Sequence, residues 1–258
     1  MSDAIHQGHV NVSIDESGIG TIEFGHPLSN SLPGNVLRKL ADTITTLGNN
    51  KDVKVIVLRS EGERAFCAGA SFDELISIDN LEVGKEFFSG FAGVINACRK
   101  CPKFIIGRIQ GKAVGGGVGL ASAVDYCFAT RYADVKLSEL AVGIGPFVVG
   151  PAVERKMGTS AMSQLAINAT EWRSARWATD NGLYAELFDE IPEMDDRINE
   201  LTIKLTKSNP QAMEMLKSIF WKGTENWDDL LNERAAMSGE LVLSEFTVNA
   251  INQFKKKS

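Results

Sequence analysis

The sequence has little histidine, little cysteine and no long apolar run, and each shortage excludes a class of function. Three histidines, all before residue 27, and four cysteines are spread over 258 residues. No Ser-His-Asp or Cys-His catalytic arrangement is therefore indicated. No signal peptide and no run of about twenty apolar residues is present, so we expect a soluble, cytoplasmic protein that makes no membrane contact.

Positive charge is also scarce. The formal net charge is -6 at pH 7, which gives no overall field to attract nucleic acid, and we expect no nucleic-acid partner. The basic run Lys255-Lys256-Lys257 is interpreted as a solvated tail, although it could bind an anionic ligand locally. The sequence contains no GxxxxGK[ST] loop and no GxGxxG after a predicted strand, which disfavours nucleotide hydrolysis.

Metal-ligand spacing occurs at Cys98 and Cys101. This CxxC pair has no second pair and no nearby histidine to complete a tetrahedral zinc site. A redox role needs the motif at a helix start, whereas this pair follows the end of a predicted helix and precedes Pro102. We therefore expect no bound metal and ordinary buried or half-buried thiols.

Hydrophobic periodicity predicts an α/β fold, because runs rich in β-branched residues alternate with apolar residues at helical spacing. The predicted strands are residues 10–14, 19–24, 53–58, 104–109, 126–130 and 135–137. The predicted helices are residues 37–47, 81–97, 151–157 and 161–168. The second glycine run opens a further predicted helix, which residues 120–123 continue. From residue 175 onward the pattern is mainly helical, and its apolar faces are expected either to cover the site or to pack on a neighbouring subunit.

Two glycine-dense turns carry the strongest functional signal. Residues 67–70 and 115–119 each follow an apolar run that predicts a buried strand. Glycine allows a close approach to a ligand, and a turn that leads into a helix leaves amides without intrahelical partners. If the turns converge, one amide from each could hold a carbonyl oxygen while it becomes an enolate oxyanion. The alternative is that these are ordinary turns.

Glu139 is the candidate acid–base residue. It stands between Leu137 and a weakly polar run at residues 140–146. Desolvation there would raise the pKa of its carboxyl group and make it able to move a proton at neutral pH. The alternative is a buried structural glutamate.

Other acidic residues have structural interpretations. Asp73 and Glu74 follow the first turn at a predicted helix start, where they would cap the helix. Asp125 follows an apolar stretch, and we expect it to bond the backbone rather than a substrate.

Three segments resemble the enoyl-CoA hydratase/isomerase, or crotonase, superfamily, and the resemblance extends over nearly the whole chain. Residues 65–71 resemble the first oxyanion segment, residues 110–117 the second, and residues 139–146 the catalytic-acid segment. The resemblance implies that the amides of Ala70 and Gly116 bind the thioester oxygen of an acyl-CoA, beside the catalytic Glu139. It also implies that Asn30, Ser31, Leu32 and Ala68 line the coenzyme A site.

The superfamily further implies a fold and an assembly. We expect a crotonase-like ββα superhelix core at residues 1–195 and a C-terminal helical trimerisation region at residues 196–258. The expected partners are an acyl-CoA thioester substrate and further copies of the chain, in a homotrimer or a dimer of trimers. Coenzyme A would be part of the substrate, with no permanently bound cofactor and no metal.

One departure from the superfamily pattern decides the predicted reaction. Hydratases of this kind hold their water with two glutamates, and the chain has Gly119 where the first would stand. Members with a single glutamate shift a double bond between the 3 and 2 positions of an acyl-CoA, so the resemblance favours an isomerase. A hydratase, a decarboxylase or thioesterase, and a non-catalytic acyl-CoA-binding protein remain alternatives. Ser71 and Asp73 also depart from the pattern, and Arg64, Lys255 or Lys256 could supply compensating charge for the coenzyme A phosphates.

Overall fold

An antiparallel hairpin opens the described part of the chain, which in this computed structural model is residues 7–255, with the backbone alone at 254 and 255. β1 (His9–Ile14) pairs with β2 (Ile19–Gly25). Gly18 turns the chain with φ +88°, which glycine adopts without strain. The Asp15 side chain accepts a hydrogen bond from the Ile19 amide at 2.8 Å and closes the turn. The predicted hairpin is confirmed.

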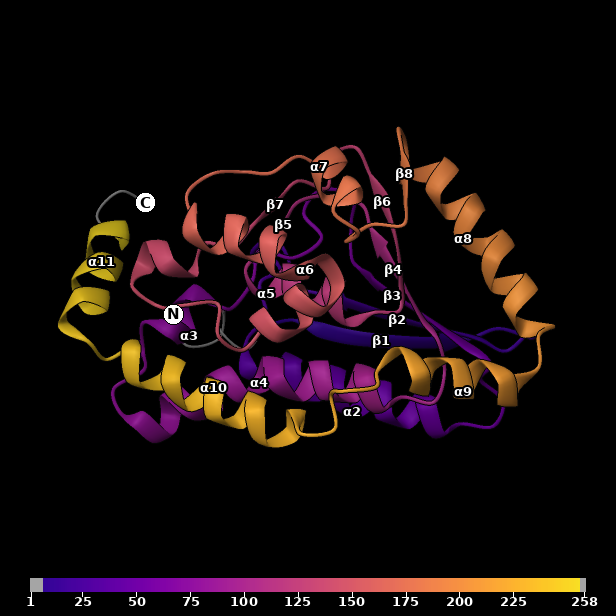
Figure 1. Cartoon of the computed structure of the whole chain (residues 1–258), viewed down its shortest axis with the longest axis horizontal. Coiled ribbons are helices and arrows are strands. Elements are labelled where there is room, and N and C mark those ends of the chain that lie inside the picture. The colour runs from indigo at the N-terminus through magenta and orange to yellow at the C-terminus, as the bar shows by residue number, and fades with distance from the viewer. Residues whose placement is uncertain (1–6, 256–258) are drawn as a thin grey trace.

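A six-stranded sheet forms the centre of the molecule, in the order β1-β2-β3-β4-β6-β8. Every neighbouring pair beyond the hairpin is parallel. The added strands are β3 (Val55–Ser60), β4 (Ile105–Ile109), β6 (Tyr126–Thr130) and β8 (Glu186–Phe188). Helices connect the parallel strands, so the predicted α/β fold is confirmed (Figure 1).

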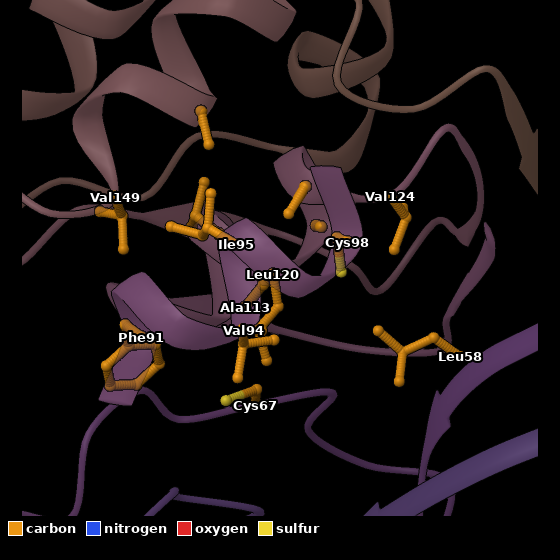
Figure 2. Close-up of a cluster of buried hydrophobic side chains, with 14 of the residues drawn as sticks. Leu58, Cys67, Phe91, Val94, Ile95, Cys98, Ala113, Leu120, Val124 and Val149 are labelled. Carbon is orange, nitrogen blue, oxygen red and sulfur yellow. The ribbon is translucent and has the colours of Figure 1, made fainter. Parts of the chain in front are cut away.

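One face of the sheet is covered by α2 (Gly34–Asn49), α4 (Leu81–Lys100) and α5 (Gly116–Ala123). Branched and aromatic side chains fill the space between them. Figure 2 shows part of this core, with Leu58 from the sheet, Ile95 from α4 and Leu120 from α5. α10 (Trp227–Leu241) packs along α4, side by side in Figure 1. This face therefore carries several helical layers.

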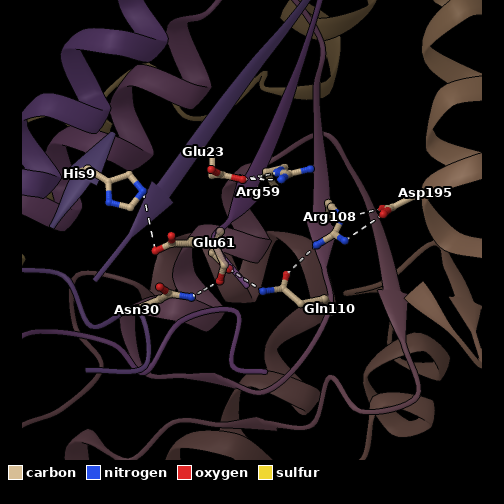
Figure 3. Close-up of polar contacts among 9 residues, drawn as sticks. His9, Glu23, Asn30, Arg59, Glu61, Arg108, Gln110 and Asp195 are labelled. Carbon is tan, nitrogen blue, oxygen red and sulfur yellow. Dashed lines mark hydrogen bonds and ion pairs between the residues drawn. The ribbon is translucent and has the colours of Figure 1, made fainter. Parts of the chain in front are cut away.

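The opposite face is covered by α8 (Ile191–Thr206). Met194 and Ile198 pack against a cluster of sheet residues. The Arg108 guanidinium in β4 holds Asp195 with two hydrogen bonds, of 2.5 and 2.9 Å (Figure 3). The predicted boundary between residues 195 and 196 falls inside α8. The two predicted regions therefore share one helix, which covers the sheet.

The remaining helices lie outside these two layers in the chain order that follows. They are α3 (Phe72–Leu75), the 3-10 helix η1 (Glu139–Val142), α6 (Gly150–Ile167), α7 (Ala175–Asp180), α9 (Pro210–Phe220) and α11 (Glu245–Lys255). The helices predicted at 151–157 and 161–168 are one element, interrupted at Gly158, where φ is +79°. In residues 7–255 no helix combines the length and the apolar character needed to span a membrane.

Two structural expectations about buried side chains are confirmed. All four cysteines are free and buried, and burial raises the pKa of Cys67 to about 12 and that of Cys127 to about 11. Asp125 accepts a hydrogen bond from the Ile105 amide at 2.8 Å, as expected. It also forms an ion pair with Lys217 at 2.8 Å, which the sequence did not indicate.

Candidate active site

The two glycine turns lie against each other. β5 (Ala113–Val114) pairs with β7 (Val135–Lys136), and the Val114 amide donates to the Cys67 carbonyl oxygen at 2.9 Å. Gly69 in the first turn has φ +93°, and a Cβ placed there would lie 2.9 Å from the Val114 oxygen and 3.6 Å from the Gly116 nitrogen. Glycine meets both the conformation and the close contact. The convergence on which the oxyanion hypothesis depends is therefore present.

Ala70 and Gly116 present backbone amides that have no hydrogen-bond acceptor among the described residues. On either side of Ala70 the backbone is bonded: the Leu32 amide donates to Gly69 at 2.8 Å, and the Ser71 amide donates to Leu32 at 3.1 Å. Gly116 is the first residue of α5, where amides lack intrahelical partners and the helix dipole favours negative charge. Both residues line one cavity, so the two amides could hold one developing oxyanion.

The carboxyl group of Glu139 lies against the second turn. Gly115 has φ +53°, and a Cβ there would lie 3.0 Å from Glu139 Oε1. The residue as a whole is half-buried, but its Oε2 atom is enclosed and has no hydrogen-bond partner within residues 7–255. Burial raises the pKa of Glu139 to about 7. Its protonated and ionised forms therefore coexist near neutral pH, which suits a group that takes up and returns a proton.

A cavity of about 200 Å³ joins these groups. Ala68, which is exposed, lies at its edge, and Ala70, Gly116 and Glu139 line it together. Most of the wall is apolar and includes Phe72, Leu75, Phe88, Phe91, Ile144 and Phe147. Four of the predicted site residues thus meet in one place.

Asn30, Ser31 and Leu32 do not line this cavity. The buried Asn30 side-chain amide donates to the backbone oxygens of Glu61 at 2.9 Å and Ala65 at 3.0 Å (Figure 3). Leu32 supports the first glycine turn through the backbone bonds described above. The structure therefore gives Asn30 and Leu32 a role in holding the turn, and the contact of all three residues with coenzyme A stays a prediction.

Gly119 lies in α5 with its Cα facing Val149. A Cβ at this position would be 2.4 Å from Val149 Cγ1 and 2.7 Å from Val149 Cβ. The valine side chain therefore fills the place that a side chain at residue 119 would need. Figure 2 shows Val149 and Phe91 on the same side of the buried cluster, and the Phe91 ring packs in the same way against Gly116.

Of the charged residues considered for the coenzyme A phosphates, Arg64 is the one whose side chain the structure describes. Ser71 caps α3 by accepting a bond from the Glu74 amide at 3.4 Å, while Glu74 accepts a bond from the Gly34 amide at 2.7 Å and so also caps α2. Arg64 is exposed and does not line the cavity. The side chain of Lys255, together with Lys256 and Lys257, lies outside the described residues.

Several wall residues could not be predicted from the sequence. Helical spacing predicts Phe88 and Phe91 as core, but it does not indicate that they face a cavity. Ser238 lies in α10, more than a hundred residues after the glycine turns, and it lines the cavity. Val149 also lines the cavity, and its side chain packs against Gly119 of α5, thirty residues earlier in the chain. No local pattern encodes such contacts.

Comparisons with known proteins show what the chain is similar to. A family model described as enoyl-CoA hydratase/isomerase matches residues 15–252. A probable enoyl-CoA hydratase of Bacillus subtilis is 26% identical over 250 residues, covering 96% of both chains. Human mitochondrial methylglutaconyl-CoA hydratase is 31% identical over 200 residues, covering 76% of this chain and 58% of the relative. The crystal structure of an enoyl-CoA hydratase from Bacillus halodurans has the same fold, with a TM-score of 0.87 at 20% identity over 95% of this chain and 99% of the other.

Proposed function

The chain belongs to the enoyl-CoA hydratase/isomerase family, and from this premise we propose that it moves a double bond between positions 3 and 2 of an enoyl-CoA. The coarser conclusion, an acyl-CoA-processing enzyme of this family, follows from the membership itself. The finer one depends on the side chains around the cavity, because one fold supports several reactions.

Glu139 would act as both base and acid. Its carboxylate takes a proton from C2 of a 3-enoyl-CoA, and the electrons of the broken C–H bond form a dienolate. The amides of Ala70 and Gly116 stabilise the thioester oxygen of that dienolate. Glu139 then returns the proton to C4, which leaves the double bond between C2 and C3. A carboxyl group with a pKa of about 7 is suited to both steps.

The contact between Gly119 and Val149 is the observation that carries this proposal. Adding water requires groups that hold and activate the water molecule. At residue 119 there is no carboxylate, and the valine side chain fills the space beside it. Among the described residues that line the cavity, Glu139 is the one with an ionisable side chain. A single carboxyl group is enough to move a proton between two carbons, and this favours the isomerase.

The experiment compares three substrates with purified protein: a 3-enoyl-CoA, a 2-enoyl-CoA and a malonyl-type thioester. We expect conversion of the 3-enoyl-CoA to the 2-enoyl-CoA, and the loss of this conversion in Glu139→Gln with acyl-CoA affinity retained. Glu16→Gln, in the exposed turn between β1 and β2, is the matched control. Binding without turnover of any substrate would favour a non-catalytic acyl-CoA-binding protein.

A hydratase is the second candidate, because the named relatives given above are called hydratases. The same assay separates the two reactions. Unchanged 3-enoyl-CoA together with rapid addition of water to 2-enoyl-CoA would replace the isomerase proposal. Release of carbon dioxide or of free coenzyme A would instead identify a decarboxylase or a thioesterase.

A trimer, or a dimer of trimers, remains our proposal for the assembly. It is supported by an apolar face on α9, where Met215, Leu216, Ile219 and Phe220 are each between 45% and 64% exposed. Such a face is typical of a subunit contact. Light scattering on the purified protein would test the assembly, and the mass of a single chain would exclude it. The cytoplasmic location also remains a prediction.

A further inference from the structure

The cavity wall indicates which acyl group the protein accepts. Resting on the proposed function, we infer that its acyl-CoA substrate carries a neutral, apolar acyl chain and that acyl groups with a second carboxylate are excluded. The inference depends on the charge, polarity and size of the wall.

Charge is the first step. Twenty of the described residues line the cavity, and Glu139 is the ionisable one among these twenty, none of which is lysine, arginine or histidine. A carboxylate at the far end of an acyl chain would therefore enter an apolar space without a counter-ion, close to another carboxyl group. Burial of an unpaired carboxylate is strongly unfavourable.

Polarity is the second step. Apart from Glu139, the polar side chains in the wall are the hydroxyls of Ser138 and Ser238. A hydroxyl can donate one hydrogen bond, but it cannot neutralise a charge. The free amides of Ala70 and Gly116 lie at the thioester end of the proposed complex, so they are not available to the end of the chain.

Size is the third step. The cavity holds about 200 Å³. At ~10–15 Å³ for each water-sized group, this volume has room for an acyl chain of at least six carbons. The rings of Phe72, Phe88, Phe91 and Phe147 form much of its wall, and they offer a flexible hydrocarbon chain extensive apolar contact.

A second cavity, of about 430 Å³, contains the nearest positive charge among the described residues that line either cavity. It shares Phe72, Val114, Ser138 and Val142 with the first cavity and adds Lys136. The Lys136 ammonium lies 4.6 Å from the centre of the Trp172 ring, so it is held against a side chain outside the first cavity. The apolar cavity thus remains without a cation of its own.

The decisive experiment compares hexanoyl-CoA with adipoyl-CoA by isothermal titration calorimetry. The two ligands have six-carbon chains and the same coenzyme A part, and they differ in the terminal carboxylate of adipoyl-CoA. Neither contains the double bond of the proposed substrate, so binding is measured without turnover. We expect hexanoyl-CoA to bind about 100-fold more tightly. Affinities equal within about threefold would overturn the inference.

Two substitutions identify the cause. Val142→Lys adds an ammonium group to the wall and is expected to reduce the preference for hexanoyl-CoA by about tenfold. Val142→Met has a long neutral side chain, and it should change the affinities of both ligands by the same factor. If adipoyl-CoA binds as tightly as hexanoyl-CoA and loses this affinity in Lys136→Met, the carboxylate reaches the second cavity and the inference is wrong.

The outcomes for the inference and for the proposed function are separate. A protein that prefers hexanoyl-CoA but does not convert 3-enoyl-CoA retains the inferred specificity and loses the isomerase proposal. A protein that isomerises 3-enoyl-CoA but binds both ligands equally retains the isomerase proposal and loses the inferred specificity. No binding of either ligand would overturn the inference, and conversion of the 3-enoyl-CoA would still decide the proposed function.

Discussion

Two carboxyl groups in this protein, Asp125 and Glu139, are taken out of water in different ways. Asp125 receives hydrogen bonds from the Ile105 amide and the Trp221 indole and forms an ion pair with Lys217, with its side chain 6% exposed. Glu139 has an enclosed oxygen with no partner in the described part of the chain. A carboxylate that stabilises a fold is surrounded by donors, whereas a carboxyl group that exchanges protons benefits from their absence.

The largest expected effect comes from Glu139→Gln. Glutamine keeps the shape of the side chain but cannot take up a proton, so we expect the isomerisation rate to fall by about a thousandfold or more. Stability should not fall, because the glutamine removes a carboxyl group that is costly to ionise in this place. Steady-state kinetics and a urea titration measure the two properties. A variant with full activity would contradict the assignment of Glu139.

Asp125→Asn should have the opposite effect: lower stability with activity retained. Removing one partner of a buried ion pair leaves the Lys217 ammonium without its counter-ion, and we expect a loss of about 3 kcal/mol in the free energy of unfolding. The rate constant for turnover should remain close to that of the parent protein. Asp125→Asn combined with Lys217→Met should recover part of the lost stability. If Asp125→Asn stops catalysis in a fully folded protein, the contrast between the two acids fails.

Gly119→Ala tests the contact between α5 and Val149, which lines the cavity. The added methyl group would overlap Val149, and overpacking of this kind costs about 1 to 3 kcal/mol. Val149→Ala in the same chain should relieve part of that cost, so the two substitutions are not additive. A double-mutant cycle with urea denaturation measures the coupling. Simple additivity would show that the two residues do not fill one space.

The smallest effect is in the pH dependence of stability. The pKa of Glu139 rises from 4.5 to about 7 on folding, so between these values the native state binds more protons than the unfolded state. The contribution of Glu139 therefore becomes less favourable as pH rises through this window. The difference in unfolding free energy between the parent and Glu139→Gln should change in that direction from pH 5 to pH 7. A difference that stays constant would show that the group is not perturbed.

Much of this arrangement could be predicted from local sequence. The central strands contain β-branched residues, and the glycine turns mark where the backbone makes close contacts, so the sheet, the two turns and Glu139 followed from short segments. Ala70 and Gly116 were singled out by the resemblance to the superfamily. β8 was missed because it has three half-buried residues without an alternating pattern. The break at Gly158 depends on one residue with φ +79° inside a helical pattern.

Side-chain contacts between distant segments could not be predicted from the sequence. Val149 fills the space beside Gly119 across thirty residues, and Asn30 bonds the backbone at Glu61 and Ala65. Lys217 reaches Asp125 from α9. Each contact depends on how packed elements meet, which hydrophobic periodicity does not encode.

The most direct test of the central claim is a carbon-13 NMR titration of the Glu139 side-chain carboxyl group in the ligand-free protein, with Glu139→Gln identifying its signal. An enclosed carboxyl group without partners should titrate at a pKa of about 7. A midpoint near the ordinary value of 4.5 would show that the group is solvated or paired, and would contradict its assignment as the acid–base residue.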